Sequence, residues 1–467
     1  MFYKRRSPNV VSWPLIFLIP PQEPSYMIPR SLRFVCLLTL FLVGSSTSTL
    51  LAQQLPSAVS SPLHDYLAIP DSVYGWKMIE KIENPLGTIY DIELTSQAWM
   101  DMTWKHVMMV YEPKQLKHKD HVLLFITGGG HLNKPNQGDR TMGLLMAQLC
   151  GARVAMLHQV PNQPLLGGRN EDDLITDTFL FQLATGDKRW PLLFPMVKSA
   201  VRAMDCVEQL AVKEWGSSVK GFVVTGASKR GWTTWLTGAT DKRVIGIAPI
   251  VIDTLNFPKQ MEYQLETWGR YSEQIEDYER KGLIKHLKED PEFPLWRWVD
   301  PWFYRAQLTL PKLIINGTND RYWAVDALNL YWDDLNGAKY IRYVPNAGHN
   351  LGGGREAALT TLAVFFQHVV EGKPGPEVDW KHETNGNTFQ LKIKSDLPPA
   401  AVKLWAASSS TKDFREAKWN STSIKETSGS FVGEVPKPDQ GHVALYGEVL
   451  FHAYGHEYSI TTQIRRE

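Results

Sequence analysis

Apolar runs and amphipathic stretches alternate through the middle of the chain. Seven runs have the length and β-branched content of strands, and several are apolar throughout, as is typical of strands buried on both faces. They lie at residues 107–111, 122–127, 153–159, 222–225, 244–252, 312–316 and 340–344. Because strands that alternate with helices are typical of βαβ units, the pattern predicts a mostly parallel sheet flanked by helices.

The helices between these strands are indicated by apolar residues spaced three and four apart. In residues 195–215, for example, Val197, Val201 and Met204 fall on one helix face. Further helices are predicted at residues 231–238, 324–335 and 355–371.

The segment 256–305 interrupts this alternation. It is long, charged and rich in aromatic residues, Tyr263, Trp268 and Trp298 among them, and it lies between two predicted strands. We interpret it as a helical lid over an active site. The alternative is a solvated insertion that only packs against the rest of the chain.

The pattern changes again after residue 371. Residues 372–377 are rich in Gly and Pro and have the composition of a linker. The sequence therefore predicts an α/β domain over residues 56–371 and a small antiparallel β domain over residues 378–467. The strands of the second domain are expected from alternating segments at residues 388–394, 402–406, 430–435 and 442–451.

The N-terminus has the layout of a secretory signal peptide. From Met27, two arginines precede an apolar run at residues 34–43, and small residues lead to a cleavage point after Ala52. The run is too short for a membrane span. We therefore expect translation from Met27 and a secreted or periplasmic protein whose mature chain has no stable membrane span. Residues 1–52 would then be upstream sequence and signal peptide, and the alternative is an uncleaved N-terminal anchor.

The composition narrows the class of protein. Lys and Arg total 50 against 49 Asp and Glu, so the chain lacks the charge excess expected of a protein that binds nucleic acid. Outside the signal peptide only Cys150 and Cys206 remain, which is too few for a disulfide framework but leaves one disulfide between them open. No motif has the spacing of zinc ligands, so neither a metal nor another cofactor is predicted.

Residues 226–231, Gly-Ala-Ser-Lys-Arg-Gly, join a predicted strand to a predicted helix. A serine in such a turn is held at a helix N-terminus, as in a nucleophile elbow, where free backbone N–H groups stabilise developing negative charge. Gly226 and Gly231 are expected where the strand and the helix come too close for a side chain. Ser228 is therefore the predicted nucleophile, although Arg230 stands where this turn usually has a second glycine.

Asp320 and His349 each follow a later predicted strand. The chain order Ser, Asp, His is that of α/β-hydrolases, and parallel strands bring their C-terminal ends to one edge of the sheet. His349 is expected to take the proton of Ser228, and Asp320 to orient the imidazole. Asp253 is the second choice for the acid and Asp326 the third.

An oxyanion hole requires two backbone donors. One is expected to be the N–H of Lys229, directly after the predicted nucleophile. The other is expected from Gly129 or Gly130, in a glycine-rich loop after an early strand, where the absence of a Cβ lets the main chain approach a substrate oxygen.

Charged residues near this edge are candidates for substrate binding. Glu171, Asp172 and Asp173 could bind a cationic group such as a substrate amine, or could be the solvated first turn of a helix. Arg230 could pair with an acidic substrate group or with a structural carboxylate.

Several segments together resemble the PhoPQ-activated pathogenicity-related protein family. They are LTSQAW (94–99), VPNQPL (160–165), PMVKSAVRAMD (195–205), VTGASKRGWTTWLTGATDKRV (224–244), APIVIDTLN (248–256), NGTNDRYWAVDA (316–327) and PNAGHNL (345–351). The resemblance implies an exported protein with an α/β-hydrolase-like fold and a β-rich C-terminal extension. It also implies a nucleophile at Ser228, an acid at Asp320 and a base at His349, and it supplies no substrate.

We therefore predict an α/β-hydrolase fold with a helical lid insertion and a small C-terminal all-β domain. The predicted function is that of an exported serine hydrolase, which cleaves a carboxylic ester or amide through an acyl-enzyme on Ser228. Its substrate is expected to be a small-molecule ester, a peptide or a carbohydrate ester. The alternatives are a secreted binding or signalling protein on the same scaffold and an aminopeptidase-like serine peptidase. The C-terminal domain could bind carbohydrate or protein, or only cover the hydrolase domain.

Overall fold

The computed structural model describes residues 61–467 except residues 132, 291 and 292. The predicted signal peptide and the proposed start at Met27 lie outside the described residues. Within the described part of the chain, no helix combines the length and the apolar character needed to cross a membrane.

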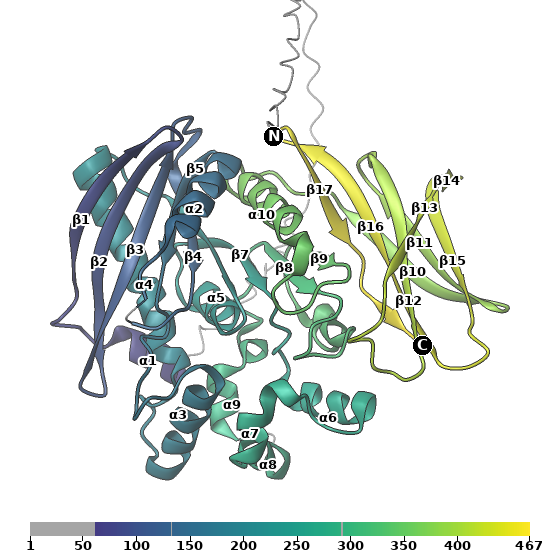
Figure 1. Ribbon diagram of the computed structural model, residues 1–467, viewed down its shortest axis with the longest axis horizontal. Helices are drawn as coiled ribbons and strands as arrows, with labels where there is room; N and C mark the ends of the chain where they lie inside the picture. The colour runs from purple at the N-terminus through teal and green to yellow at the C-terminus, as the bar shows by residue number, and fades with distance from the viewer. Residues whose placement is uncertain (1–60, 132, 291–292) are drawn as a thin grey trace, which may run out of the picture. The chain divides into compact units, whose positions relative to one another are not determined.

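The strands predicted from the apolar runs form the centre of one large sheet (Figure 1). Its first nine strands lie in the order β1-β2-β3-β5-β4-β6-β7-β8-β9. Strands β1 to β3 pair antiparallel, as do β3 and β5, whereas the pairs from β5 through β4 to β9 are all parallel. The strands are β1 (Gly75–Asn84), β2 (Gly87–Trp99), β3 (Met102–Pro113), β4 (His118–Ile126), β5 (Ala152–Leu157), β6 (Gly221–Ala227), β7 (Val244–Ile250), β8 (Lys312–Gly317) and β9 (Lys339–Val344).

Both faces of the central strands are buried, because side chains alternate between two hydrophobic clusters. Leu124 and Val224 belong to one cluster, and their neighbours Leu123 and Val223 belong to the other. Helices α4 and α5 contribute to the first cluster, and α2 and α10 to the second. The helices before the central insertion, with α10, are α1 (Pro62–Ala68), α2 (Gln137–Cys150), α3 (Glu171–Thr185), α4 (Leu193–Leu210), the π-helical turn η1 (Ala211–Trp215), α5 (Lys229–Thr240) and α10 (Arg355–Val370).

The insertion between β7 and β8 is helical, as predicted. Its helices lie near α3 at the lower side of the molecule in Figure 1, and α3 contacts α7 and α8. They are α6 (Phe257–Trp268), η2 (Glu273–Ile275), α7 (Glu276–Arg280), α8 (Leu283–Glu289), α9 (Pro294–Val299) and η3 (Pro301–Tyr304).

The predicted helix at residues 324–335 is instead two short 3₁₀ turns, η4 (Ala327–Leu330) and η5 (Trp332–Asp334). Tyr331 between them has φ −143°, which is outside the helical range. Its side chain is buried and its hydroxyl donates to Asp253.

The C-terminal part of the chain is β-rich, as predicted, and part of it continues the central sheet. Strand β17 pairs with β9, at Thr461 and Ile341, and β16, β12 and β13 follow beyond it. A separate four-stranded sheet has the order β10-β11-β15-β14. The strands are β10 (Val378–Asn385), β11 (Thr388–Ser395), β12 (Ala401–Ser409), β13 (Asn420–Ile424), β14 (Glu426–Thr427), β15 (Ser430–Pro436), β16 (His442–Ala453), β17 (His456–Thr461) and β18 (Arg465–Arg466).

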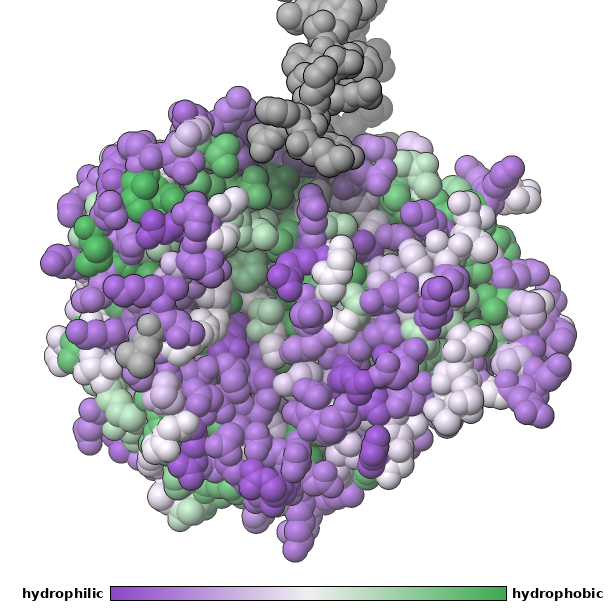
Figure 2. All heavy atoms as spheres, in the orientation of Figure 1, coloured by the Kyte–Doolittle hydropathy of each residue, from purple (hydrophilic) through white to green (hydrophobic). Residues whose placement is uncertain are grey.

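This arrangement is an α/β-hydrolase fold with a helical insertion and a β-rich C-terminal part. Cys150 and Cys206 are buried free thiols and do not form the disulfide that the sequence left open. Hydrophilic residues cover most of the face in Figure 2, and apolar residues are more frequent on its upper part.

Candidate active site

Ser228 lies in the turn between β6 and α5, at the C-terminal end of a central strand. Its backbone has φ 58° and ψ −125°, a conformation that costs a non-glycine residue about 1–3 kcal/mol. The Ser228 N–H donates to the Ile250 carbonyl over 2.8 Å, which ties the turn to β7. The hydroxyl makes no capping hydrogen bond to α5. The turn therefore has the geometry of a nucleophile elbow, with the hydroxyl free of the usual N-cap role.

The two glycines around this turn stand where a side chain would collide, as the sequence predicted. A Cβ on Gly226 would lie 2.7 Å from the Arg230 carbonyl oxygen, and one on Gly231 would lie 2.6 Å from Cγ2 of Ile252. Helix α5 can therefore approach β6 and β7 closely only with glycine at both positions.

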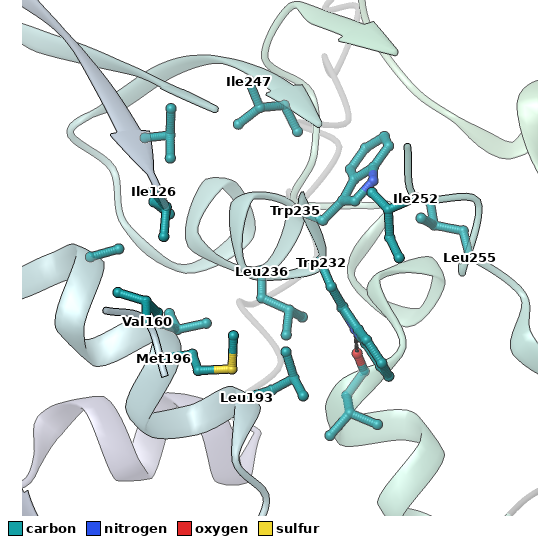
Figure 3. Close-up of a cluster of buried hydrophobic side chains, with 14 of the residues drawn as sticks. Ile126, Val160, Leu193, Met196, Trp232, Trp235, Leu236, Ile247, Ile252 and Leu255 are labelled. Carbon is teal, nitrogen blue, oxygen red and sulfur yellow. Dashed lines mark hydrogen bonds between the residues drawn. The ribbon is translucent and has the colours of Figure 1, made fainter. Parts of the chain in front are cut away.

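The helix that follows Ser228 is anchored by large apolar side chains (Figure 3). Trp235 and Leu236 of α5 are fully buried, and Leu193 and Met196 of α4 lie beside Leu236. The Trp232 indole N–H donates to the Val299 carbonyl over 2.6 Å, which connects α5 to the insertion. These contacts fix the helix whose N-terminus carries the serine.

Asp320 and His349 are hydrogen-bonded to each other past the ends of β8 and β9. Nδ1 of His349 lies 2.8 Å from Oδ2 of Asp320, and the Tyr322 N–H donates to Oδ1 over 2.9 Å. A carboxylate only accepts hydrogen bonds, so Nδ1 carries the imidazole proton and Nε2 is the basic nitrogen. None of the described residues is a hydrogen-bond partner of this buried Nε2.

The loops that carry Asp320 and His349 pack directly on each other. The Asn319 N–H donates to the Ala347 carbonyl over 2.9 Å. A Cβ on Gly317 would lie 2.3 Å from that same carbonyl oxygen, so β8 must end in glycine for the two loops to meet. The backbone thus sets the distance between the carboxylate and the imidazole.

The two alternative acids, Asp253 and Asp326, are hydrogen-bonded to residues other than His349. Asp253 accepts hydrogen bonds from Tyr331 and from Asn316, the latter over 2.9 Å, and burial raises the pKa of Asp253 to about 6. Asp326 accepts from the Tyr263 hydroxyl over 2.6 Å. Of the three candidate acids, the described structure brings Asp320 alone to the histidine.

Ser228 and His349 line a common chamber of about 30 Å³. Phe257 of the insertion and Trp323 form part of its wall. The Tyr322 ring packs against the imidazole at an interplanar angle of 32°, with centroids 4.3 Å apart, so it also limits the space beside the histidine. The insertion thus borders the chamber.

A polar cluster that the sequence did not predict borders this chamber. Asp172 lies 2.6 Å from Nζ of Lys229, and it accepts from the hydroxyls of Tyr278 over 2.9 Å and Tyr322 over 3.2 Å. Although burial opposes ionisation of the amine, Asp172 and Tyr322 raise the pKa of Lys229 above its ordinary value. The one sequence feature that could have indicated this cluster is Tyr322, two residues after the predicted acid. The direction of its side chain, however, depends on contacts with the insertion and with α3.

Arg230 pairs with a structural carboxylate, one of its two predicted partners. Its guanidinium donates to Glu171 over 2.7 and 2.9 Å. A Cβ on Gly128 would lie 2.5 Å from the guanidinium carbon, so the glycine-rich loop makes room for this side chain. Asp173, the third acidic residue at the start of α3, pairs with Lys281 of the insertion. The acidic cluster is therefore largely neutralised within the chain.

The glycine-rich loop borders a second, larger cavity of about 680 Å³, here called the cleft. Gly129 has φ +101°, which favours glycine, and it lines the cleft together with His349. The Gly130 carbonyl accepts from the Asn133 N–H over 2.9 Å. Lys229 is the first residue of α5, where backbone N–H groups have no partner within the helix. Lys229 lines the chamber with Ser228 and Gly129 lines the cleft with His349, so the predicted oxyanion donors remain candidates.

Comparisons with known proteins match most of the chain. The family model described as PhoPQ-activated pathogenicity-related protein matches residues 63–415. Autocrine proliferation repressor protein A of Dictyostelium discoideum is 32% identical over 438 residues, which cover 86% of this chain and 88% of that protein.

Two solved structures are similar in part. Acetyl xylan esterase 1 from Thermoanaerobacterium sp. JW/SL YS485 has a TM-score of 0.45 and 14% identity, covering 65% of this chain and 92% of its own. The acetyl xylan esterase from Paenibacillus sp. R4 has a TM-score of 0.45 and 14% identity, covering 64% and 90%.

Proposed function

This chain belongs to the PhoPQ-activated pathogenicity-related protein family, and we propose that it is a serine hydrolase that cleaves carboxylic esters through an acyl-enzyme on Ser228. The observation that carries the proposal is the pair of Asp320 and His349. His349 lines the same small chamber as Ser228, and its Nε2 has no hydrogen-bond partner among the described residues. A histidine oriented by a carboxylate beside a serine in a strained elbow is the arrangement that activates a hydroxyl.

In the proposed reaction, Nε2 of His349 takes the hydroxyl proton as Ser228 Oγ attacks the ester carbonyl carbon. The N–H of Lys229 and one from the loop containing Gly129 stabilise the negative charge on the carbonyl oxygen. The bond to the alcohol oxygen then breaks, and His349 returns the proton to that oxygen. Water next attacks the acyl-enzyme and gives one proton to His349, which passes it back to Ser228 as the carboxylic acid leaves.

Labelling with a fluorophosphonate tests whether the serine is activated. We expect the purified protein to be labelled at Ser228, and Ser228→Ala and His349→Ala to lose the label because nucleophile and base act together. Asp253→Asn is the matched control, since it alters a buried carboxylate outside the proposed triad and should still label. A folded parent protein that stays unlabelled with excess probe, or label on another residue, contradicts the proposal.

The basic segment and the apolar run after Met27 favour export, and we propose that the hydrolase acts outside the cytoplasm. An aminopeptidase-like activity is not proposed. The carboxylates Glu171 and Asp172, which would bind a substrate amine, are already paired with Arg230 and Lys229.

A second candidate is a secreted signalling protein on the same scaffold. It is favoured by the name of the relative from Dictyostelium discoideum, a repressor of proliferation. The Ser228→Ala variant separates the two functions. A signalling role that is independent of catalysis survives in this variant, whereas a role that depends on hydrolysis does not.

A further inference from the structure

Two cavities of very different size meet at His349. Ser228 and His349 line the chamber of about 30 Å³, and His349 also lines the cleft of about 680 Å³. Resting on the function proposed above, we propose that the chamber receives the acyl group and the cleft receives the alcohol. The substrate is then an ester of a short, uncharged acyl group with a larger polar alcohol.

The size of the chamber limits the acyl group. The chamber has about 30 Å³ and the cleft about 680 Å³, so the chamber has room for only a small group. The walls include Trp232, Phe257, Ile275 and Trp323, each at most 6% exposed. Enlarging a chamber with such packed walls costs free energy, so a longer acyl chain is disfavoured.

Unpartnered polar atoms indicate that this chamber is built for a ligand. Among the described residues, Oγ1 of Thr254 and Nε1 of Trp323 have no hydrogen-bond partner, although both atoms are buried, and both residues line the chamber. A buried polar group without a partner costs about 1–3 kcal/mol, so such groups need a functional or solvent partner. The two atoms are therefore consistent with a chamber that a ligand or a water molecule fills.

The charges at the chamber favour an uncharged acyl group. Asp172 and Lys229 form an ion pair there, with Tyr278 and Tyr322 as further hydrogen-bond partners of the carboxylate. Because the carboxylate and the amine neutralise each other, neither is available to pair with a charged substrate group.

The cleft differs in both size and chemistry. Its lining includes Asn133, Asp139, His158 and Arg355. His158 is 9% exposed, and its Nε2 has no hydrogen-bond partner among the described residues. A volume of several hundred Å³ with a few polar groups is typical of a site for a small molecule, here a hydroxylated one.

The order of the reaction assigns the two cavities to the two halves of the ester. After the first step the acyl group stays bonded to Ser228, so it must fit the chamber that Ser228 lines. The alcohol oxygen must take a proton from His349, which borders the cleft as well. The alcohol can then leave through the larger cavity while the acyl group remains.

Two isomeric esters test this orientation directly. Benzyl acetate has a small acyl group and a large alcohol, and methyl phenylacetate reverses the two at the same composition. We expect kcat/KM to be at least about tenfold higher for benzyl acetate, and glucose monoacetate to be preferred in the same way over methyl glucuronate. Equal rates, or a preference for the methyl esters, overturn the inference.

A variant of the chamber wall tests the size limit. Ile275→Ala should raise the ratio of butyrate to acetate hydrolysis with p-nitrophenyl esters by about tenfold, because the lost atoms make room for a longer chain. The matched control is Ile284→Ala, a buried isoleucine of the same insertion outside the chamber lining, which should leave the ratio unchanged. An unchanged ratio in Ile275→Ala, or an equal change in both variants, overturns the size limit.

Fluorophosphonate labelling separates this inference from the proposed function. Labelling at Ser228 together with hydrolysis of long acyl esters leaves the serine hydrolase intact and overturns the short acyl group. A protein that neither labels nor hydrolyses any of these esters overturns both.

Discussion

Contacts with neighbouring residues keep Ser228 in its strained backbone conformation. The residue has a positive φ, yet its N–H is bound to the Ile250 carbonyl and the next helix is anchored by buried tryptophans. A strained residue persists only where the surrounding structure fixes it, and such strain clusters at functional sites. The strained strand-to-helix turn, more than the serine itself, marks Ser228 as the candidate nucleophile.

Buried histidines make the stability of the protein sensitive to acid. His106 is 1% exposed, with Nε2 3.0 Å from Ser96 Oγ and Nδ1 3.0 Å from the His158 carbonyl oxygen. Burial lowers the pKa of His106 from 6.5 to about 4. As the pH falls below 6.5, the imidazole of His106 is protonated in the unfolded chain, whereas in the folded protein it stays neutral until about pH 4. The free energy of unfolding therefore decreases as the pH falls from 6.5 to about 4.

His106→Gln is expected to reduce that loss by on the order of 3 kcal/mol, because it removes the titrating ring. The measurement is the free energy of unfolding by urea at neutral pH and near pH 4, in parent and variant. If both proteins lose the same stability between the two pH values, His106 is not the source.

For single residues, the sequence predicted the backbone geometry better than the contacts between side chains. The clashes that require Gly226 and Gly231 follow from a strand-to-helix turn alone. The cluster of Lys229, Asp172 and Tyr322 could not be predicted, because it joins three segments whose relative positions are set by the fold.

One loop of the C-terminal part braces the elements around the site. It joins β12 to β13 over residues 410–419. The Asn319 amide donates to the Ala417 carbonyl over 2.7 Å, and Asn346 exchanges hydrogen bonds with the Trp419 backbone over 2.7 and 2.9 Å. Since Asn319 and Asn346 belong to the loops of Asp320 and His349, this brace supports both.

The same loop contacts the insertion at residues 256–305 through Arg415. Its guanidinium lies 2.8 Å from Glu273 and 4.2 Å from the Trp268 ring centroid, and both partners belong to the insertion. Arg415→Met should speed limited proteolysis within residues 256–305 by about tenfold, because the lid loses these contacts. Arg280→Met is the control, since Arg280 is an exposed residue of the lid itself. Equal cleavage of parent and Arg415→Met shows that the lid does not depend on the brace.

The type of most elements could be predicted from local patterns, but their contacts could not. Every predicted central strand lies largely within an observed strand, because a buried strand reads as an apolar run whatever its partner. The α-helix predicted at residues 324–335 is wrong, because the segment forms two 3₁₀ turns. Tyr331 between them is hydrogen-bonded to Asp253 in the interior. Such a tertiary contact overrides local preference and leaves no periodic signal.

The central sheet and the C-terminal strands form one continuous structure. Strand β17 pairs with β9, and Arg342 of β9 forms a buried ion pair with Glu448 of β16 over 3.0 Å. The alternating pattern predicted the C-terminal strands, but nothing local indicates that one of them pairs with a strand more than a hundred residues earlier. The role favoured by these contacts is support of the central sheet.

Removal of the C-terminal part should therefore unfold the rest. A chain ending at residue 377 exposes the edge of β9 that pairs with β17, and it also exposes the part of α10 that β17 contacts. We expect this chain to aggregate without a cooperative thermal transition, whereas the chain through residue 467 unfolds cooperatively in calorimetry. A soluble, cooperatively unfolding truncated chain would show instead that residues 378–467 are an independent domain.

Trapping the acyl-enzyme is the most direct test of the whole account. The protein is mixed with p-nitrophenyl acetate, quenched in acid within the first turnover, digested and analysed by mass spectrometry. We predict a burst of p-nitrophenol and an acetyl group on the peptide that contains Ser228, with both absent in Ser228→Ala. Hydrolysis that persists in Ser228→Ala, or an acetyl group on another residue, would contradict the central claim that Ser228 is the nucleophile.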